Sequence, residues 1–114
     1  MKISIITVTL NSEKTVRDTL NSVLSQSVKC FEHIIVDGGS KDKTYELLKK
    51  YPNKRKKIFK KRNYGIYKSI NYAINKARGD FICVLNSDDI FHSNNTIREL
   101  ITIIKKNKKI DIFL

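Results

Sequence analysis

Two adjacent aspartates, Asp88 and Asp89, stand just beyond the apolar run Phe81–Leu85 in the segment FICVLNSDDIF. Neighbouring carboxylates repel each other, and a divalent cation would relieve that repulsion. Carboxylates suit hard cations such as Mg²⁺ or Mn²⁺, which usually take one or two protein carboxylates together with phosphate oxygens. The pair therefore indicates a site for a metal and a diphosphate. The alternative is that both acids cap the helix that follows.

Polar residues also follow two other predicted strands. These segments are Thr9, Leu10 and Asn11 at the end of the first strand, Asp37-Gly38-Gly39-Ser40 at the end of the second, and Asn86 and Ser87 before the acid pair. Ligands of parallel sheets bind beyond the carboxyl ends of the strands, so these segments should share one edge. Asn11 or Ser12 could instead cap a helix, as could Ser40 with Asp42 in the first turn, and Asp-Gly-Gly could simply turn the chain. Together they favour a binding site, in which Asp37 could accept hydrogen bonds from a base or ribose.

Hydrophobic periodicity predicts the elements that would position these residues. The predicted strands are 3–10, 33–36, 57–60 and 81–85, with a further strand beginning at 110–114. The predicted helices are 16–24, a segment around Leu47 and Leu48, 66–77 ending before Gly79, and 97–104. This alternation predicts an α/β fold, with a mostly parallel sheet and helices on both of its faces.

Length and composition narrow the class of protein. The 114 residues, 40% of them hydrophobic, fit one globular domain over residues 1–114. Cys30 and Cys83 form no CxxC pair, so we interpret them as reduced thiols in a cytoplasmic protein. There is no GxxxxGK(S/T) or GxGxxG motif, and His33 and His92 are interpreted as structural or surface residues. No apolar run reaches the length of a membrane span.

The charge is strongly positive and uneven. The chain has 23 basic and 11 acidic residues, and seven of the basic ones fall in KRKKIFKKR, residues 54–62. Such a run is either a solvated surface or an attractor of phosphate-bearing ligands, anionic lipid headgroups or nucleic acid. Nucleic acid is the weakest of these, because no stacking ladder, helix-turn-helix spacing or zinc-finger pattern accompanies the charge.

Three ordered segments carry a resemblance to a known family. They are IIxVTLNSExTVxxTLNSVLSQ, FEHIIVDGGSKDKT and NYGIYKSINYAINKARGDFICVLNSDDIF. With VDGGSxD, GIYxxxNxAxxxAxGD and LNSDD in this order, the chain resembles the N-terminal half of a family 2 glycosyltransferase. That family has the GT-A, Rossmann-like architecture, and the likeness is strongest to bacterial members that build surface polysaccharides. The resemblance runs from Lys2 to about Leu114 and implies a chain that is incomplete at its C-terminal end.

The resemblance implies a site for a nucleotide-diphosphate sugar. The implied binding residues are Thr9, Leu10, Asn11, Asp37, Gly38, Gly65, Asn71, Asn86, Ser87 and Asp88. Asp37 would bind the base or ribose, and Leu10 stands where an aromatic residue often stacks near the base. Asp88 matches the closing acid of the DxD motif and would be the main ligand of Mn²⁺ or Mg²⁺, with Asp89 as a supporting acid. In the family the cation acts as a Lewis acid while an acceptor hydroxyl attacks the anomeric carbon, mostly with inversion.

The sequence also departs from the family pattern. Gly38 stands where a second acid is common, and Asn86 replaces the first Asp of DxD. Lys61, Asn63 and Lys68 occupy positions where related sequences often carry acids. These changes suit either a more anionic donor or relaxed constraint. Family members are usually longer, and their second half supplies the acceptor site and the general base, so no residue is assigned as that base here.

Three functions remain open from the sequence. The first is a glycosyltransferase that moves a sugar from a nucleotide-diphosphate sugar to a hydroxyl of a glycan or lipid-linked acceptor. The second is a catalytically impaired donor-binding fragment, or a partner module completed by another chain or by a homo-oligomer. The third is a basic binder of anionic membrane or nucleic acid, although no nucleic acid partner is expected. We expect a cytoplasmic protein that associates peripherally with the inner face of the cell membrane.

Overall fold

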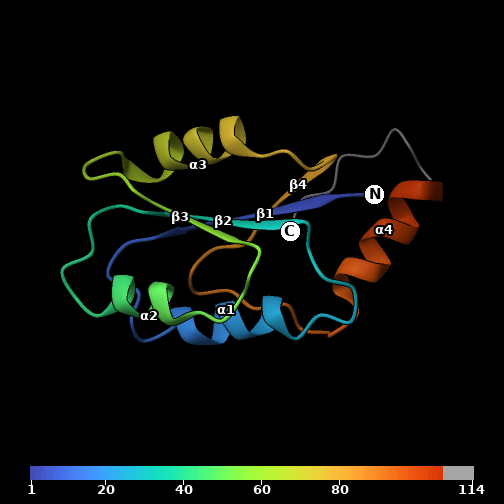
Figure 1. The fold of residues 1–114 in the computed structure, drawn as a ribbon, viewed down its shortest axis with the longest axis horizontal. Coiled ribbons are helices and arrows are strands. Elements are labelled where there is room, and N and C mark those ends of the chain that lie inside the picture. The colour runs from blue at the N-terminus through green and yellow to red at the C-terminus, as the bar shows by residue number, and fades with distance from the viewer. Residues whose placement is uncertain (107–114) are drawn as a thin grey trace.

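The computed structural model of the chain describes residues 1–106, in which strands and helices alternate (Figure 1). The elements are β1 (Ile3–Thr9), α1 (Val16–Leu24), β2 (Glu32–Asp37), α2 (Thr44–Lys50), β3 (Lys56–Lys60), α3 (Gly65–Lys76), β4 (Phe81–Val84) and α4 (Thr96–Lys106). The order predicted from the sequence is confirmed over these residues. The strand predicted at 110–114 lies outside the described residues.

The described strands form one parallel sheet in the order β3-β2-β1-β4. Thr9 at the end of β1 pairs with Asp37 at the end of β2, and Asp37 pairs in turn with Lys60 at the end of β3. On the other side of β1, Ile6 pairs with Val84, the last residue of β4. The carboxyl ends of these strands therefore lie at one edge of the sheet, as the α/β prediction requires.

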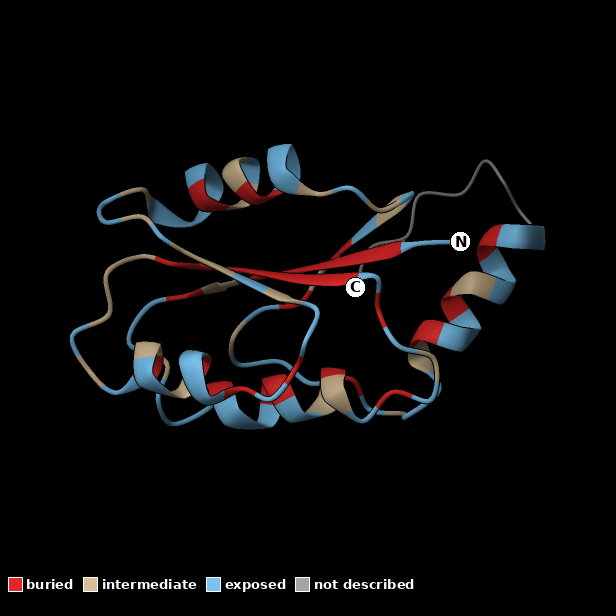
Figure 2. Cartoon of the chain, viewed as in Figure 1, coloured by how far each residue is buried: buried red, intermediate tan, exposed pale blue. Residues whose placement is uncertain are grey.

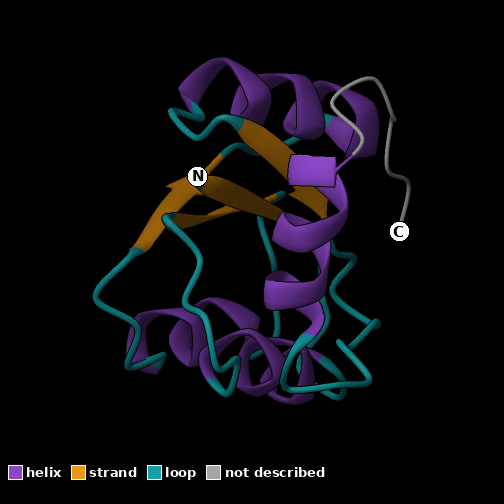
Figure 3. Ribbon diagram, turned by 90° about the vertical axis from the view of Figure 1, so that its right-hand side faces the viewer, coloured by secondary structure: helices purple, strands orange, loops and turns teal. Residues whose placement is uncertain are grey.

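Helices cover both faces of the sheet (Figures 1 and 3). Ala73 of α3 packs in one apolar cluster with Ile34 of β2. Leu48 of α2 packs in another with Ile35, the next residue of the same strand. Because successive side chains of a strand point to opposite faces, one buried strand supplies both layers. The prediction of helices on both faces is confirmed.

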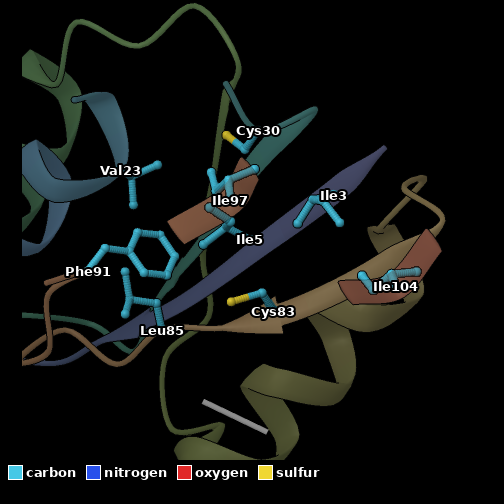
Figure 4. Packing of buried hydrophobic residues seen from close by; sticks show 9 residues of the cluster. All are labelled: Ile3, Ile5, Val23, Cys30, Cys83, Leu85, Phe91, Ile97 and Ile104. Atoms are coloured by element: carbon cyan, nitrogen blue, oxygen red, sulfur yellow. The ribbon is translucent and has the colours of Figure 1, made fainter. Parts of the chain in front are cut away.

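The two central strands, β1 and β2, are buried along nearly their whole length (Figure 2). A further apolar cluster joins α4 to α1 and the sheet; its members are Ile3, Ile5, Val23, Cys30, Cys83, Leu85, Phe91, Ile97 and Ile104 (Figure 4). Both cysteines are free, and burial raises the pKa of the Cys83 thiol to about 12. In the described part of the chain, every helix is too short or too polar to cross a bilayer.

The first helix starts later than the predicted caps imply. The Ser12 carbonyl accepts hydrogen bonds from the amides of Thr15 and Val16, which forms a turn before α1. Thr15 occupies the capping position of α1, without a side-chain hydrogen bond. The prediction that Asn11 or Ser12 caps this helix is therefore wrong, because the turn moves the helix start to Val16.

The second helix also lacks its predicted cap. Lys43 precedes α2, and its side chain makes no capping hydrogen bond. The hydroxyl of Ser40 donates instead to Asp37, so the cap prediction for Ser40 is wrong. Asp42 lies before the helix and not in its first turn. From that position its carboxylate accepts hydrogen bonds from the amide of Thr44 at 2.9 Å and from the Thr44 hydroxyl.

A buried hydrogen-bonded chain links the sheet to the end of α2. The Nε2 atom of His33 lies 2.8 Å from the Thr7 hydroxyl, and its Nδ1 atom lies 3.2 Å from the Tyr51 hydroxyl. The side-chain amide of Asn53 donates to the same Tyr51 hydroxyl at 2.8 Å. Burial lowers the pKa of His33 to about 3. His33 is thus a neutral structural residue, which agrees with its interpretation from the sequence.

Candidate functional site

An open cleft of about 720 Å³ lies at the carboxyl edge of the sheet. Its lining residues are Val8, Asn11, Ser12, Glu13, Lys14, Thr15, Asp42, Ile66, Asn86, Ser87 and Asp88. They come from β1, from the loops after β1, β2 and β4, and from the start of α3. The volume lies within the range of small-molecule sites, about 300–1,000 Å³. Asn11, Asn86, Ser87 and Asp88, all named from the sequence, meet in this cleft.

The loop after β4 is fixed through its backbone. The Ser87 carbonyl accepts hydrogen bonds from the hydroxyls of Thr15 at 2.9 Å and Thr19 at 3.0 Å. Thr19 also approaches the Asp89 carbonyl, at 2.6 Å. The hydroxyls of Ser12 and Ser87 lie 2.9 Å apart. Because α1 and its preceding turn hold the loop in this way, the cleft wall is preorganised.

The two aspartates differ in their surroundings. Asp88 is exposed and lines the cleft, and its carboxylate has no hydrogen-bonding partner within residues 1–106. Asp89 does not line the cleft, and its carboxylate lies 3.4 Å from the side-chain amide of Asn86. The described residues contain no group of three or more His, Cys, Asp or Glu side chains able to hold a metal. The donors fit a cation held by one or two carboxylates plus ligand phosphates, and not an all-protein metal cage.

The carboxylate of Asp37 is fully buried and bonds within the protein. Its Oδ1 atom accepts from the hydroxyls of Thr9 at 2.8 Å and Ser40 at 2.5 Å. Its Oδ2 atom accepts from the amides of Gly39 at 3.1 Å and Ser40 at 2.9 Å. Asp37 therefore ties the end of β1 to the loop after β2. Its contact with a base or ribose stays a prediction.

Asn11 links the same two loops from the cleft wall. Its backbone has a φ of 49°, in the left-handed region that Asn tolerates better than most residues. Its side-chain oxygen accepts from the amide of Lys41 at 2.8 Å, and its own amide donates to the Ser40 hydroxyl at 2.9 Å. The amide of Ser12 donates to the Thr44 hydroxyl at 2.7 Å. The turn after β1 and the loop after β2 thus hold each other in place.

The remaining predicted residues do not line the cleft. Leu10 is exposed next to Gly38, where an added Cβ would meet the Leu10 Cδ1 atom at 3.6 Å, an ordinary contact. Gly65 has a φ of 73° at the start of α3, so this position favours glycine. Asn71 is exposed on α3. The roles of these residues in binding stay predictions, although Gly65 directly precedes Ile66 of the cleft wall.

Several cleft residues were not assigned to the site from the sequence: Val8, Ser12, Glu13, Lys14, Thr15, Asp42 and Ile66. The polar run that follows β1 was a visible signal. The sequence pattern of this run predicts the start of a helix. The turn closed by the Ser12 carbonyl shows that the run forms part of the cleft wall instead. Lys14 is the most informative of these residues, because it brings a positive charge into the cleft that Asp88 also lines.

The model of glycosyl transferase family 2 matches residues 4–113. The chain belongs to this family. It is 33% identical over 112 residues to an uncharacterized glycosyltransferase of Rickettsia typhi, covering 98% of this chain and 35% of the relative. It is 32% identical over 112 residues to the poly(ribitol-phosphate) beta-N-acetylglucosaminyltransferase TarS of Staphylococcus aureus, covering 94% of this chain and 19% of the relative. The chain thus spans 19% to 35% of the length of these two relatives.

Solved structures of glycosyltransferases have the same fold. Residues 1–349 of S. aureus TarS in complex with UDP-GlcNAc match with a TM-score of 0.87 and 33% identity, covering 95% of this chain and 32% of that chain. The mannosyltransferase PcManGT from Pyrobaculum calidifontis, in complex with GDP-Man and Mn²⁺, matches with a TM-score of 0.82 and 17% identity, covering 90% of this chain and 32% of that chain. The second likeness shows the fold alone. The architecture is that of the GT-A glycosyltransferases, as the resemblance implied.

Proposed function

We propose that this chain binds the nucleotide-diphosphate sugar donor of a glycosyltransferase that acts in surface polysaccharide or related glycan synthesis. The observation that carries the proposal is the cleft at the carboxyl edge of the sheet, with the carboxylate of Asp88 in its wall and without a hydrogen-bonding partner among the described residues. Ligands of open α/β sheets bind at this position. Membership of family 2 and the likeness to TarS in complex with UDP-GlcNAc support a nucleotide sugar as the ligand.

Asp88 is the residue that would hold a divalent cation, Mn²⁺ or Mg²⁺, with Asp89 as a supporting acid. Such a cation, when bound, stabilises the charge on the departing nucleoside diphosphate. Lys14 lines the same cleft and would attract the diphosphate. Asn11 and Asn86 present side-chain amides that can bond to ribose or sugar hydroxyls.

Residues beside the cleft would support binding in a different way. Thr9 and Asp37 keep the ends of β1 and β2 joined, so the loops that follow these strands and line the cleft do not need to reorganise when a donor binds. Leu10 and Gly38 lie at these same strand ends, and we propose that they lie beside the base of the bound nucleotide. Asp37 would therefore act mainly by positioning its neighbours.

The acceptor hydroxyl needs a general base, and none is assigned among the carboxylates of the cleft. Hydrogen bonding from the Thr44 hydroxyl lowers the pKa of the Asp42 carboxyl, which makes it a weaker base. We propose direct attack on the anomeric carbon with inversion. The general base would lie next to the site that binds the acceptor, which would be a glycan or a lipid-linked sugar.

A second candidate is a donor-binding module that another chain or a second copy completes. The observation that favours it is the cleft, whose lining holds candidate donor-binding side chains and no carboxylate that we assign as the general base. The two candidates differ in one measurable respect. Both bind the donor, and only the transferase releases sugar from it.

Release of nucleoside diphosphate from a panel of UDP, GDP, CDP and dTDP sugars tests the proposal, with Mn²⁺ present or removed by a chelator. Turnover that stops with the chelator supports the transferase. Donor binding without turnover supports the module. Absence of both binding and turnover with every donor contradicts both candidates.

A further inference from the structure

The positive charge of the chain is concentrated in one continuous segment. Residues 47–79 contain twelve of the 23 basic residues and no acidic residue. The rest of the chain carries eleven basic and 11 acidic residues, so its formal charges cancel. The segment covers the end of α2, all of β3 and all of α3. The net charge of +12 is therefore a local property of this region.

Part of the segment lies on α3 and on the neighbouring side of β3, and we call this region the α3 face. Its members are Lys57, Phe59 and Lys61 on and just after β3, and Tyr64, Ile66, Tyr67, Lys68, Tyr72, Ile74 and Lys76 on and just before α3. Figure 1 shows α3 as the outer layer on its side of the sheet. Glu32 is the carboxylate that pairs with Lys57, at 2.8 Å, and its side chain is only 2% exposed.

Lysine ammonium groups lie over the rings of Tyr64 and Tyr72, two of the aromatic side chains of the α3 face. The Lys61 and Lys76 Nζ atoms lie 4.7 Å and 5.5 Å from the ring centre of Tyr72. The Lys68 Nζ atom lies 4.3 Å from the ring centre of Tyr64. The two tyrosine rings also meet edge to face, 6.1 Å apart. Cation–π contacts hold the charges in place, and rings covered in this way are poorly placed to stack on a base or a sugar.

Apolar side chains project from the same helix. Ile66, Tyr67 and Ile74 are 63%, 85% and 41% exposed. Tyr67 and Ile74 are seven residues apart, so they lie on one side of α3. At a membrane surface, lysines reach the headgroups, tyrosine lies at headgroup level and isoleucine enters the acyl boundary.

We propose that the α3 face docks on the surface of an anionic lipid bilayer. Charge complementarity selects the partner, because residues 47–79 carry no acid to repel lipid phosphates. The exposed Ile66, Tyr67 and Ile74 select a bilayer over a dissolved polyanion, which would leave these side chains in water. Nucleic acid fits less well, because lysines cover the rings of Tyr64 and Tyr72, which are then poorly placed to stack on its bases.

Docking through this face would bring the candidate site to the membrane surface. Ile66 belongs both to the α3 face and to the cleft lining. A lipid-linked acceptor would then reach the cleft from the bilayer. This last step rests on the proposed function, whereas the docking itself does not.

Co-sedimentation with vesicles tests the docking, using phosphatidylcholine alone or mixed with phosphatidylglycerol. The test variant combines Lys61→Gln, Lys68→Gln and Lys76→Gln. The matched control removes the same charge through Lys43→Gln, Lys49→Gln and Lys50→Gln, at the two ends of α2 on the opposite face of the sheet (Figure 1). Each lysine near an anionic membrane contributes about fivefold in partitioning, so the test variant should lose on the order of 100-fold. The control should stay within about threefold, because charges beyond the Debye length are screened.

A second variant, Tyr67→Ser with Ile74→Ser, tests the apolar contribution and should weaken vesicle binding without changing the charge. Melting followed by circular dichroism verifies that each variant is folded. Equal losses in the test and control variants would overturn the proposal, as would equal binding to pure phosphatidylcholine. Tighter binding to DNA than to the mixed vesicles, lost in the test variant, would assign the face to nucleic acid instead. Nucleoside-diphosphate binding is measured on the same proteins, so that failure of the docking and failure of the proposed function are seen separately.

Discussion

Asp88 and Asn86 both line the cleft but differ in charge and in partners, and we propose that donor binding depends on that difference. Asp88 lines the cleft without a hydrogen-bonding partner in residues 1–106, whereas Asn86 lies within hydrogen-bond distance of Asp89. Asp88→Ala should abolish metal-dependent nucleotide binding. Asn86→Ala should weaken it by about tenfold or less, the value of one hydrogen bond. Titration of both variants with a nucleoside diphosphate and Mn²⁺ measures this, and undiminished binding in both would contradict the assignment.

His33 gives the stability of the protein a defined pH dependence. Its pKa is lowered from 6.5 to about 3 by burial. Below pH 6.5 the unfolded chain takes up a proton that the folded chain does not, so stability is complete above this pH and falls as the pH decreases towards 3. The expected slope approaches about 1.4 kcal/mol per pH unit.

Urea unfolding at pH values above and below 6.5 measures the contribution of His33. The His33→Gln variant should be less stable at neutral pH, because glutamine cannot keep both hydrogen bonds that the imidazole ring makes with Thr7 and Tyr51. In this variant, the free energy of unfolding should also lose most of its dependence on pH below 6.5. A wild-type profile that stays flat as the pH falls would show that the unfolded and folded chains bind this proton equally.

Some residues at the candidate site could be predicted from the sequence, and others could not. The position of Asp88 at the cleft was predictable, because two adjacent acids closely follow an apolar strand in the sequence. The role of Asp37 in joining two strand ends was not, because it depends on Thr9 standing opposite Asp37 in the parallel register. A register between strands 28 residues apart is a tertiary fact, and local pattern does not specify it.

The elements themselves were predictable, and their starting points were not. The apolar runs of β1, β2 and β4 are long enough in sequence to specify strands, and the described sheet contains all of them. Helix starts depend on which partner a hydroxyl finds. Ser40 is a residue type that often caps helices, but its hydroxyl donates a hydrogen bond to Asp37 instead. Ser12 likewise lies against Ser87, from the far end of the described chain.

The link between α1 and the loop after β4 predicts that a residue outside the cleft controls binding. Thr19→Val keeps the shape of the side chain and removes the donor that serves the carbonyls of Ser87 and Asp89. We expect a stability loss of about 1–3 kcal/mol and weaker metal-dependent nucleotide binding, because the loop that carries Asp88 loosens.

Thr102→Val is the matched control for this variant, since the Thr102 hydroxyl donates to the Arg98 carbonyl within α4. It should leave nucleotide affinity unchanged. Chemical denaturation and calorimetric titration of both variants separate the two effects. Wild-type affinity in a destabilised Thr19→Val protein would show that α1 does not position the loop.

Within residues 1–106, acids outnumber lysines in the cleft, and lysines supply the charge of the α3 face. Asp88 and Asp42 line the cleft, and the lysines of the α3 face lie on the outer layer beside it. Vesicle binding should therefore fall steeply with added salt, since the screening length shrinks from about 10 Å at 0.1 M to about 3 Å at 1 M. Co-sedimentation over a salt series measures this. Binding that is insensitive to salt would show that the apolar side chains alone hold the protein on the membrane.

The central claim is that the cleft binds a nucleoside diphosphate together with a divalent cation. The family and the fold make this the expected ligand class, and Asp88, which has no hydrogen-bonding partner within residues 1–106, would supply the metal ligand. Isothermal titration with UDP, GDP, CDP and dTDP, each with Mn²⁺ and again with a chelator, tests it most directly. The account predicts saturable heat with at least one of these nucleotides, lost on chelation and in Asp88→Ala. Absence of heat with every nucleotide, with or without metal, would contradict it.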